Sequence, residues 1–519
     1  MALNELLGLG VVAAAVAGAD GASRRGHGRR GGTGRSARPP APPGWGRRPG
    51  AEAGPARWAA RRDLGALVVA RPTPGRVTLG RSGRRLVAAE AGHSVLVVGP
   101  TQSRKTSGFA VPAILEWQGP VLAASVKSDL ARHTVGWRSR LGRVAVYDPT
   151  GATGMTAAPW SPLCAAGTWE GARAVAASLT EVARSSAGSL TDGDFWYATA
   201  AKLLAPLLHA AAVSGRGMAD VLRWLDTQET EEVADALALA EAWPALQAAL
   251  ASWGRDERQR SAVYTTAETA LDAFAAPDVA AGEAAHRGGA LDPAAVLDGC
   301  HTLYLCAPAH DQRRLRPLFA TVVAQVVTAA YERATRAGAP IDPPLLVVLD
   351  EAANIAPLAD LDVLASTGAG HGVQLVTVWQ DLAQLDARYG RRAGTVVNNH
   401  RVKVFLSGIA DPATLEHAST LVGDTEVRNR TVTVDTRGAT SSTDAPAARR
   451  LLAPDALRRI VPGRAVAISG HLPPVALALR SWHDVPALRR RAQVPVDPGA
   501  PGAPLSAPAP PRSHPRPGR

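Results

Sequence analysis

The stretch SVLVVGPTQSRKTSGFAVPAIL, residues 94–115, predicts a buried strand, a turn and the start of a helix. Its middle part, Gly99–Thr106, follows the phosphate-loop pattern G-x-x-x-x-G-K-[ST], except that Arg104 replaces the second glycine. Backbone amides at a helix N-terminus attract phosphate, while the lysine reaches the terminal phosphates and the threonine hydroxyl binds Mg²⁺. We therefore expect a nucleotide site with ATP and Mg²⁺ as its cofactors.

Seven loop positions are assigned to nucleotide binding: Gly99, Thr101, Ser103, Arg104, Lys105, Thr106 and Ser107. Lys105 strengthens this assignment, because lysine is rare in this arginine-rich chain. The planar fork of arginine is too large for a phosphate cradle, whereas lysine acts as a compact point charge. Arg104 argues the other way, since a side chain costs about 1 kcal/mol where φ is positive. Its side chain can point outward; a degenerate loop that binds nucleotide poorly is the alternative.

A second motif, PPLLVVLDEAANI, spans residues 343–355 and places Asp350 and Glu351 after an apolar strand. We expect Asp350 to hold Mg²⁺ together with Thr106, and Glu351 to activate the attacking water as a general base. An acidic pair that simply complements a helix N-terminus is the alternative. Gln380 ends the apolar run 373–380, where it is expected to sense the γ-phosphate or orient the water, unless it is only a turn residue. The predicted catalytic residues are thus Glu351, Lys105 and Gln380.

The fold class predicted by the apolar pattern is α/β with a mainly parallel sheet. Continuous apolar runs are typical of strands that are buried on both faces. Such runs lie at 95–100, 120–125, 144–149, 302–308, 345–350, 373–380 and 402–408, with a later pair within 465–482. Lys127 and Asp148 also end strands, at the edge where parallel sheets bind ligands. Residues 165–290 have helical apolar spacing instead, which predicts an all-α insertion between two strands.

The two ends of the chain differ from its middle in charge. Residues 1–86 carry 16 Arg and 4 acidic residues, whereas residues 87–483 carry 35 basic and 39 acidic residues. Basic tails bind nucleic acid or anionic lipid, although a solvated linker is an equal alternative. The uncharged run 6–19 is shorter than the roughly 20 residues that span a bilayer, and a cationic flank follows it. Three scattered cysteines argue for a reducing compartment and against zinc.

From these patterns we divide the chain into six segments. They are a short apolar anchor at 1–20, a disordered linker at 21–56, the two parts of a nucleotide-binding domain at 57–164 and 291–490, the all-α insert at 165–290, and a disordered Pro-rich tail at 491–519. The expected location is the cytoplasmic face of the cell membrane, with the N-terminus as anchor; if the run 6–19 is a plain apolar tail, the expected location is the cytoplasm.

The ordered motifs also resemble a known family. The residues VVGPTQSRKTSGFAVPAILEWQGPVLAASVKSDL, VAVYDPTG, APWSPL, VVLDEAANIAPLADLDVLASTGAGHGVQLVTVWQDLAQLDARYG and VVNNHRVKVFLSGIAD resemble the type IV secretion coupling proteins, the conjugative DNA-transfer ATPases, in their actinobacterial form. The resemblance runs from about Trp58 to Trp482. It implies a RecA-like phosphate-loop NTPase core that forms a homohexamer and moves single-stranded DNA, with its relaxase, to a secretion channel. The helical insert would then face the cytoplasm, where relatives recognise the relaxosome.

The chain departs from the family pattern at several points. Arg104 replaces glycine, and the apolar N-terminal run is shorter than the usual pair of transmembrane helices. Many relatives carry an arginine in the segment after the acidic pair, where it completes the neighbouring subunit's site. Here Ala369 and Gly370 occupy that place, and Arg388, Arg391, Arg392 and Arg401 stay open as replacements. Two other functions compete: a double-stranded DNA translocase of the FtsK/HerA type, and a degenerate ATPase that recruits the relaxosome as a scaffold.

Overall fold

The computed structural model describes most of the chain between its two ends. The described residues are 55–186, 193–284, 291–308, 310–356, 358–434, 438 and 440–496. The predicted anchor, nearly all of the predicted linker and most of the predicted C-terminal tail lie outside them. Within the described residues, no helix is both long enough and apolar enough to cross a membrane.

A twelve-stranded sheet forms the centre of the fold, in the order β1-β3-β2-β14-β13-β10-β4-β9-β8-β5-β7-β6. The seven strands from β10 to β6 are all parallel, which confirms the predicted mainly parallel α/β sheet. Each of the seven predicted apolar runs forms one of them. Their bounds are β4 Val95–Val98, β5 Val121–Ser125, β6 Val144–Tyr147, β7 Thr302–Cys306, β8 Leu345–Asp350, β9 Val373–Trp379 and β10 Val402–Leu406.

Five antiparallel strands extend this sheet beyond β10. The late pair predicted within 465–482 is confirmed as β13 (Arg464–Ser469) and β14 (Val475–Ala478). The sequence analysis did not predict the other three strands: β1 Val68–Val69, β2 Thr78–Ser82 and β3 Arg85–Ala88.

Both faces of the parallel region are buried, because successive residues of a strand point to opposite faces. In β4, Leu96 and Val98 join one core, and Val95 and Val97 join the other. One core is covered by α1 Val111–Glu116, α2 Asp129–Arg132, α3 Val135–Arg138 and α18 Pro486–Ala492. The other is covered by α11 Gln312–Ala337, α12 Ala352–Ile355, α13 Leu361–Thr367, α14 Ala383–Tyr389, α15 Ala393–Asn399, α16 Pro412–Val422 and α17 Pro454–Arg458. The sheet is therefore sandwiched between two helical layers.

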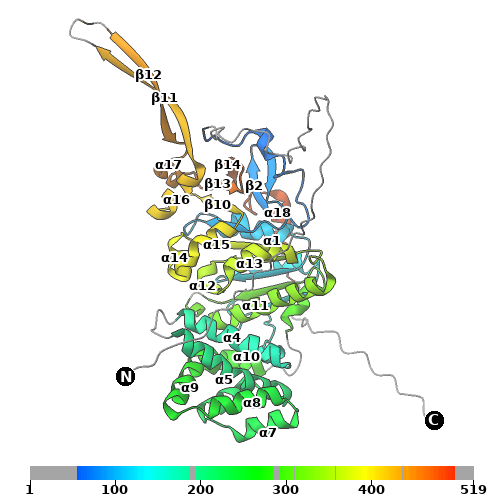
Figure 1. Cartoon of the computed structure of the whole chain (residues 1–519). Helices are drawn as coiled ribbons and strands as arrows, with labels where there is room; N and C mark the ends of the chain where they lie inside the picture. The colour runs from blue at the N-terminus through cyan, green and yellow to red at the C-terminus, as the bar shows by residue number, and fades with distance from the viewer. Residues whose placement is uncertain are drawn as a thin grey trace, which may run out of the picture. The chain divides into compact units, whose positions relative to one another are not determined.

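A helical insert separates β6 from β7, as predicted. Its helices are α4 Trp169–Ser186, α5 Gly193–Val213, α6 Met218–Asp226, α7 Glu231–Leu239, α8 Trp243–Trp253, α9 Glu257–Leu271 and α10 Pro277–Ala284. Helix α5 is the centre of this bundle and contacts α4, α6, α7, α8 and α9. Figure 1 shows α11 between the sheet and the insert, where it packs against α4.

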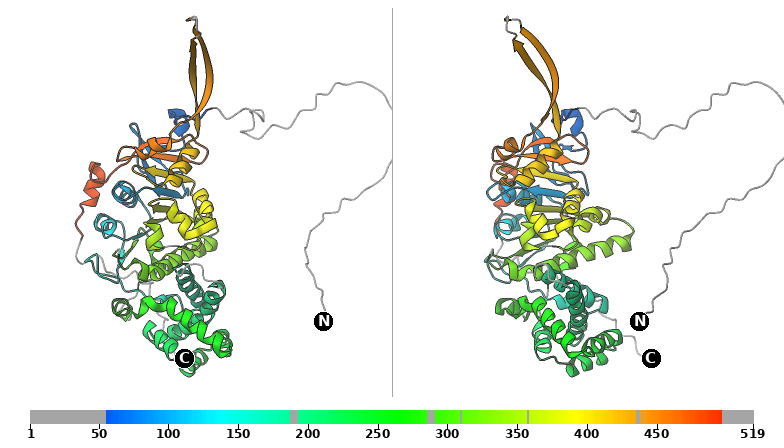
Figure 2. Two further views of the ribbon diagram at one scale, coloured as in Figure 1. Left: turned by 90° about the vertical axis from the view of Figure 1, so that its left-hand side faces the viewer. Right: turned by 60° about the vertical axis from the view of Figure 1, so that its left-hand side comes forward.

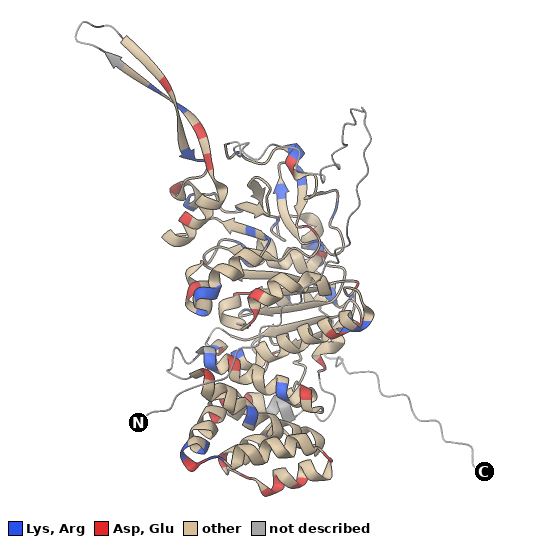
Figure 3. Ribbon diagram, viewed as in Figure 1, with Lys and Arg blue, Asp and Glu red and all other residues tan. Residues whose placement is uncertain are grey.

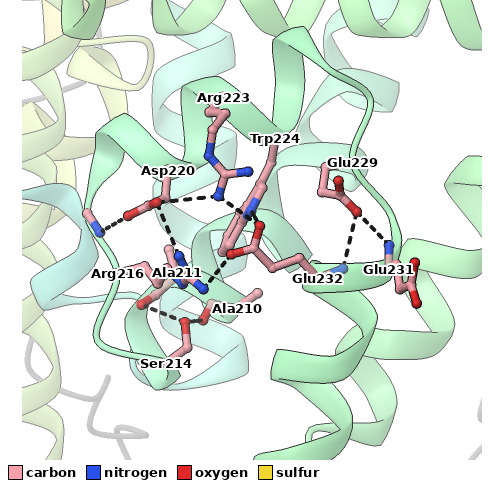
Figure 4. A network of polar contacts seen from close by, with 11 residues as sticks. Ala210, Ala211, Ser214, Arg216, Asp220, Arg223, Trp224, Glu229, Glu231 and Glu232 are labelled. Carbon is pink, nitrogen blue, oxygen red and sulfur yellow. Dashed lines mark hydrogen bonds and ion pairs between the residues drawn. The ribbon is translucent and has the colours of Figure 1, made fainter.

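A polar network joins α6 to α7 inside the insert (Figure 4). The side chain of Trp224 is fully buried, and its indole nitrogen donates a 2.9 Å hydrogen bond to Glu232. Glu232 also pairs with Arg223 at 2.8 Å and with Arg216 at 2.5 Å. Both guanidinium groups lie 6.0 Å from the centre of the Trp224 ring. One carboxylate thus ties together two helices and the turn that precedes them.

A two-stranded ribbon projects from the rest of the fold (Figure 2). Its strands, β11 (Asp424–Val434) and β12 (Thr440–Arg450), pair along their whole length. The described side chains of both strands are exposed or half-buried, so the ribbon has no core of its own. At its base, Arg450 pairs with Glu416 of α16 at 2.6 Å, and the Ala56 amide donates to the Asp424 carbonyl at 2.8 Å. Ala56, near the start of the described residues, therefore lies beside the foot of the ribbon.

Candidate functional site

The predicted phosphate loop connects the carboxyl end of β4 to a short π-helix, η2 (Thr106–Ala110). Its first residue is anchored to the sheet, because the Gly99 amide donates to the Trp379 carbonyl of β9 at 3.0 Å. A Cβ atom at Gly99 would lie 2.7 Å from Ser103 Oγ and 2.8 Å from the Leu406 side chain. Only glycine fits at this position. Ser103 Oγ in turn donates to the Pro100 carbonyl at 2.7 Å and holds the turn.

Lys105 lies inside the loop and is buried. Its ammonium donates to the carbonyls of Gly99 at 2.6 Å and Pro100 at 3.0 Å. Burial lowers the pKa of this lysine, while the nearby carboxylates of Asp350 and Glu351 act to raise it. A charged ammonium in a desolvated loop is the group that a phosphate would bind best.

Thr106 and Asp350, predicted as a metal-binding pair, are in direct contact across 244 positions of sequence. Thr106 Oγ1 donates to Asp350 Oδ2 at 2.9 Å. The hydroxyl of Ser125, at the end of β5, donates to the same oxygen at 3.3 Å. The other oxygen, Oδ1, is buried and accepts a hydrogen bond from no described residue. Burial accordingly raises the pKa of Asp350.

This donor set fits Mg²⁺, which prefers carboxylate and hydroxyl oxygens. A buried carboxylate oxygen without a partner costs free energy, and a cation would remove that cost. Burial lowers the pKa of Lys105 and raises the pKa of Asp350, so it disfavours the charged form of both. A bound nucleotide with its metal would stabilise both charged forms.

Glu351 and Gln380 leave neighbouring strands on the same edge of the sheet. Glu351 is half-buried, and it caps α12 in a left-handed conformation with φ of 62°. Such a conformation is uncommon for a residue other than glycine and is found at functional sites. Gln380 follows β9, which lies between β4 and β8, and its amide donates to Gln384 Oε1 at 3.0 Å. Gln380 therefore lies on the strand next to the loop's strand, and Glu351 lies one strand farther along the sheet.

Arg104 adopts the conformation for which glycine is favoured, with φ of 66°. Its side chain points away from the loop and pairs with Asp484 at 3.2 Å; both side chains are about half exposed. Two residues earlier, the Trp482 amide donates to the Ser107 carbonyl at 3.0 Å. The segment after β14 is thus attached to the loop at two points. Thr101 is exposed on the loop's outer side.

The four open arginine positions differ in what they contact. Arg392 pairs with Asp362 and Asp360, and Arg401 precedes β10 at the amino edge of the sheet, opposite the loop. Arg388 is half-buried on the side of the insert, where burial lowers its pKa. Arg391 is exposed, and it forms no ion pair with any residue that the structure describes. Arg401 is likewise exposed and has no ion pair with a described residue, so its place at the amino edge is what separates it from Arg391.

The remaining strand-end residues have different surroundings. Lys127 is exposed and close enough to lower the pKa of Lys105. Asp148 is buried and accepts hydrogen bonds from Thr150 at 3.0 Å and from the Thr153 amide at 2.7 Å, so it serves its own turn. Sequence reasoning missed Ser125. This residue ends β5 in register with Asp350 of β8, and that pairing is the one feature that points to it. It also missed Asp381, which acts to raise the pKa of Lys105.

Comparison with known proteins gives consistent results. A family model described as type IV secretory system conjugative DNA transfer matches residues 58–497. Two conjugal transfer proteins TraG of Escherichia coli are each 26% identical, over 78% and 70% of this chain. The chain matches 71% and 61% of the lengths of these two relatives.

Solved structures share the fold at lower sequence identity. The bacterial conjugative coupling protein TrwB, lacking its N-terminal 70 residues, is 19% identical with a TM-score of 0.61; the match covers 83% of this chain and 95% of that one. TrwB in complex with ADP and Mg²⁺ has a TM-score of 0.58 at 19% identity, over 75% and 85% of the two chains. The mainly parallel sheet and its helical insert are therefore shared with TrwB.

Proposed function

The chain belongs to the type IV secretory system conjugative DNA-transfer family, and from this premise we propose that it binds ATP with Mg²⁺ and hydrolyses ATP to move single-stranded DNA. The contact between Thr106 and Asp350 carries the proposal. It joins the loop after β4 to the acidic end of β8, and it leaves one buried carboxylate oxygen of Asp350 without a hydrogen-bond partner among the described residues. A bound Mg²⁺ would supply positive charge that stabilises the transferring phosphoryl group.

Each site residue has a proposed role. Lys105 binds the terminal phosphates, Thr106 and Asp350 hold the metal, and the amides of the loop cradle the phosphate chain. Glu351 takes a proton from the attacking water, and Gln380 orients that water from the neighbouring strand. Ser125 keeps Asp350 in place through its hydrogen bond.

The working form is proposed to be a homohexamer in which each subunit completes its neighbour's site. The arginine usual after the acidic pair is missing, so another cation must supply the positive charge. Arg391 is the best candidate because it is exposed and has no ion pair among the described residues; Arg401 shares both properties but lies at the amino edge of the sheet, opposite the loop. The proposed partners are single-stranded DNA, relaxase and relaxosome proteins, and components of the secretion channel. The proposed place of action is the cytoplasmic face of the membrane, and the segment boundaries given above stay predictions.

One observation supports a second candidate, a degenerate ATPase that recruits the relaxosome as a scaffold. Arg104 holds a strained conformation in the loop, which would slow turnover if the strain disturbed the cradle. The outward direction of its side chain, toward Asp484, argues against an obstructed site. ATP binding without turnover in the wild-type protein would favour the scaffold.

A double-mutant cycle tests the metal assignment. Thr106→Ala, Asp350→Asn and the combined variant are compared with wild type for Mg²⁺-dependent ATP affinity. If both residues hold one ion, their effects should not add, with an interaction free energy of about 0.5–3 kcal/mol. Additive effects would contradict the shared site. In parallel, Lys105→Ala should abolish DNA transfer; transfer at the wild-type level would refute the proposed function.

A further inference from the structure

The helical insert carries an open groove between α4, α5 and α8. It has a volume of about 770 Å³, within the range of ligand-binding clefts. Alanines from the three helices line it, among them Ala177, Ala198 and Ala251, which are exposed. Methyl groups on all three walls make the groove apolar and allow another backbone to approach closely.

Three cations surround this alanine-lined groove: Arg173 on α4, Lys202 on α5 and Arg255 after α8. Among the residues that the structure describes, no acidic residue lines the groove, and none of the three cations has an ion-pair partner. The Nε atom of Arg255 is buried and has no acceptor among those residues. An unsatisfied buried donor is costly, so an acceptor from outside would be favourable here.

The charge of the groove opposes that of the insert around it. Residues 165–290 contain 17 acidic and 9 basic residues, and Figure 3 shows the acidic residues of α7 without a basic neighbour on that helix. A basic groove in an acidic domain is not explained by composition. The net negative charge of the insert disfavours a negative partner elsewhere on its surface, so such a partner is favoured only at the basic groove.

We propose that this groove docks an acidic, amphipathic helix of a partner protein. The apolar stripe of such a helix would pack on the alanines, and carboxylates beside the stripe would pair with Arg173, Lys202 and Arg255. Single-stranded DNA fits less well, because bases need aromatic surfaces and Trp169 is the one aromatic residue among the described residues of the lining. Docking itself requires no ATP turnover; identifying the partner as transferred cargo rests on the proposed function.

The test uses the full chain and a synthetic helical peptide of about 18 residues with a leucine stripe flanked by glutamates. Fluorescence anisotropy should show binding to wild type, and the Arg173→Glu/Lys202→Glu variant should bind at least about tenfold more weakly. The control is Arg258→Glu, the same kind of charge reversal at an exposed position on α9 outside the groove. This variant should bind the peptide as tightly as wild type. A peptide with lysine in place of glutamate should not bind.

A second variant tests the apolar wall without changing charge. Ala177→Leu fills the groove from an exposed position and should weaken peptide binding, whereas Ala240→Leu at the end of α7 should not. Circular dichroism and ATP turnover are measured on every variant. A variant that loses peptide binding but keeps the ATP turnover of wild type supports docking at the groove. This conclusion holds even if the protein proves not to hydrolyse ATP. No binding by wild type, equal binding by the double variant, or full displacement by a single-stranded oligonucleotide would overturn the proposal.

Discussion

At the scale of the residue, Arg104 shows how a motif departs from its pattern without losing its geometry. The loop keeps the left-handed turn that glycine normally provides, and the side chain leaves the cradle to pair with Asp484. The backbone strain costs about 1 kcal/mol, and an exposed ion pair returns less than that. The departure is therefore tolerable for nucleotide binding.

We predict that Arg104→Gly leaves ATP turnover within about threefold of wild type and changes the free energy of unfolding by less than about 1 kcal/mol. Glycine relieves the strain while removing the ion pair, and these effects oppose each other. Gln102→Gly is the matched control, because Gln102 shares the left-handed conformation, with φ of 65°, but is outside this pair. A loss of turnover beyond tenfold in Arg104→Gly alone would give the guanidinium an active role.

His400 supplies a prediction on pH. The imidazole is fully buried: Nε2 lies 3.0 Å from the Thr377 hydroxyl, and Nδ1 lies 2.7 Å from the Val396 carbonyl. Burial lowers the pKa of His400 to about 4. In the unfolded chain His400 takes up a proton near pH 6.5, whereas in the folded chain it stays neutral until about pH 4. The free energy of unfolding is therefore highest above pH 6.5 and falls as the pH drops from 6.5 toward 4.

The measurement is the free energy of unfolding at pH 7.5 and pH 5. We expect His400→Gln to remove about 2 kcal/mol of the pH-dependent loss that wild type shows. His471→Gln, at an exposed position, should keep the full loss. The half-buried histidines His93, His133, His301 and His417 have pKa values lowered by burial and act in the same direction, so only the difference between variants is diagnostic. An identical loss in His400→Gln would contradict this account.

Sequence reasoning paired Thr106 with Asp350, because each belongs to a motif with fixed spacing, and the structure places the two side chains in contact. It missed Ser125, which belongs to no motif and becomes a neighbour of Asp350 only through strand order. The adjacency of β5 and β8 depends on helices that cross over the sheet, and the local sequence does not encode it.

At the scale of the element, apolar continuity was sufficient to predict all seven parallel strands. The ribbon β11–β12 was missed because it has no apolar face; Thr, Ser and Arg occupy both sides. Strands β1–β3 are only two to five residues long and lie in an arginine-rich stretch, so their apolar residues form no long run.

The exposed ribbon should be dispensable for folding. Replacing residues 428–446 by Asn-Gly leaves the pairs up to Val427 and Ala447 and provides a two-residue turn. Because the removed part buries no core residue, the melting temperature should change by no more than about 2 °C. Deleting β2–β3 instead, which removes the buried Leu79 and Val87, should unfold the protein. A large destabilisation on shortening the ribbon would mean that it packs against something in the assembled protein.

The insert should depend strongly on Trp224. Trp224→Ala removes a fully buried side chain and leaves the carboxylate of Glu232 with two arginines but no indole donor. We expect a loss of about 3–5 kcal/mol in the free energy of unfolding. Trp243→Ala, on the same insert but 56% exposed, should cost less than about 1 kcal/mol. Equal effects from both variants would contradict the packing described here.

At the scale of the whole molecule, the fold separates the two proposed sites. The proposed nucleotide residues lie at the carboxyl edge of the parallel strands, whereas the groove lies on the insert, beyond α11. Helix α11 contacts both the insert, through α4, and α12, which begins after Glu351. A change at the site could therefore reach the insert through one rigid element.

The central claim is that this chain is an ATPase driven by the Thr106–Asp350 site and used on single-stranded DNA. The most direct measurement is phosphate release by the purified full chain, with and without single-stranded DNA, for wild type and Glu351→Gln. We predict turnover that single-stranded DNA stimulates, and a loss of at least about a hundredfold in Glu351→Gln with ATP binding retained. No turnover by wild type, or equal turnover by the variant, would contradict the account.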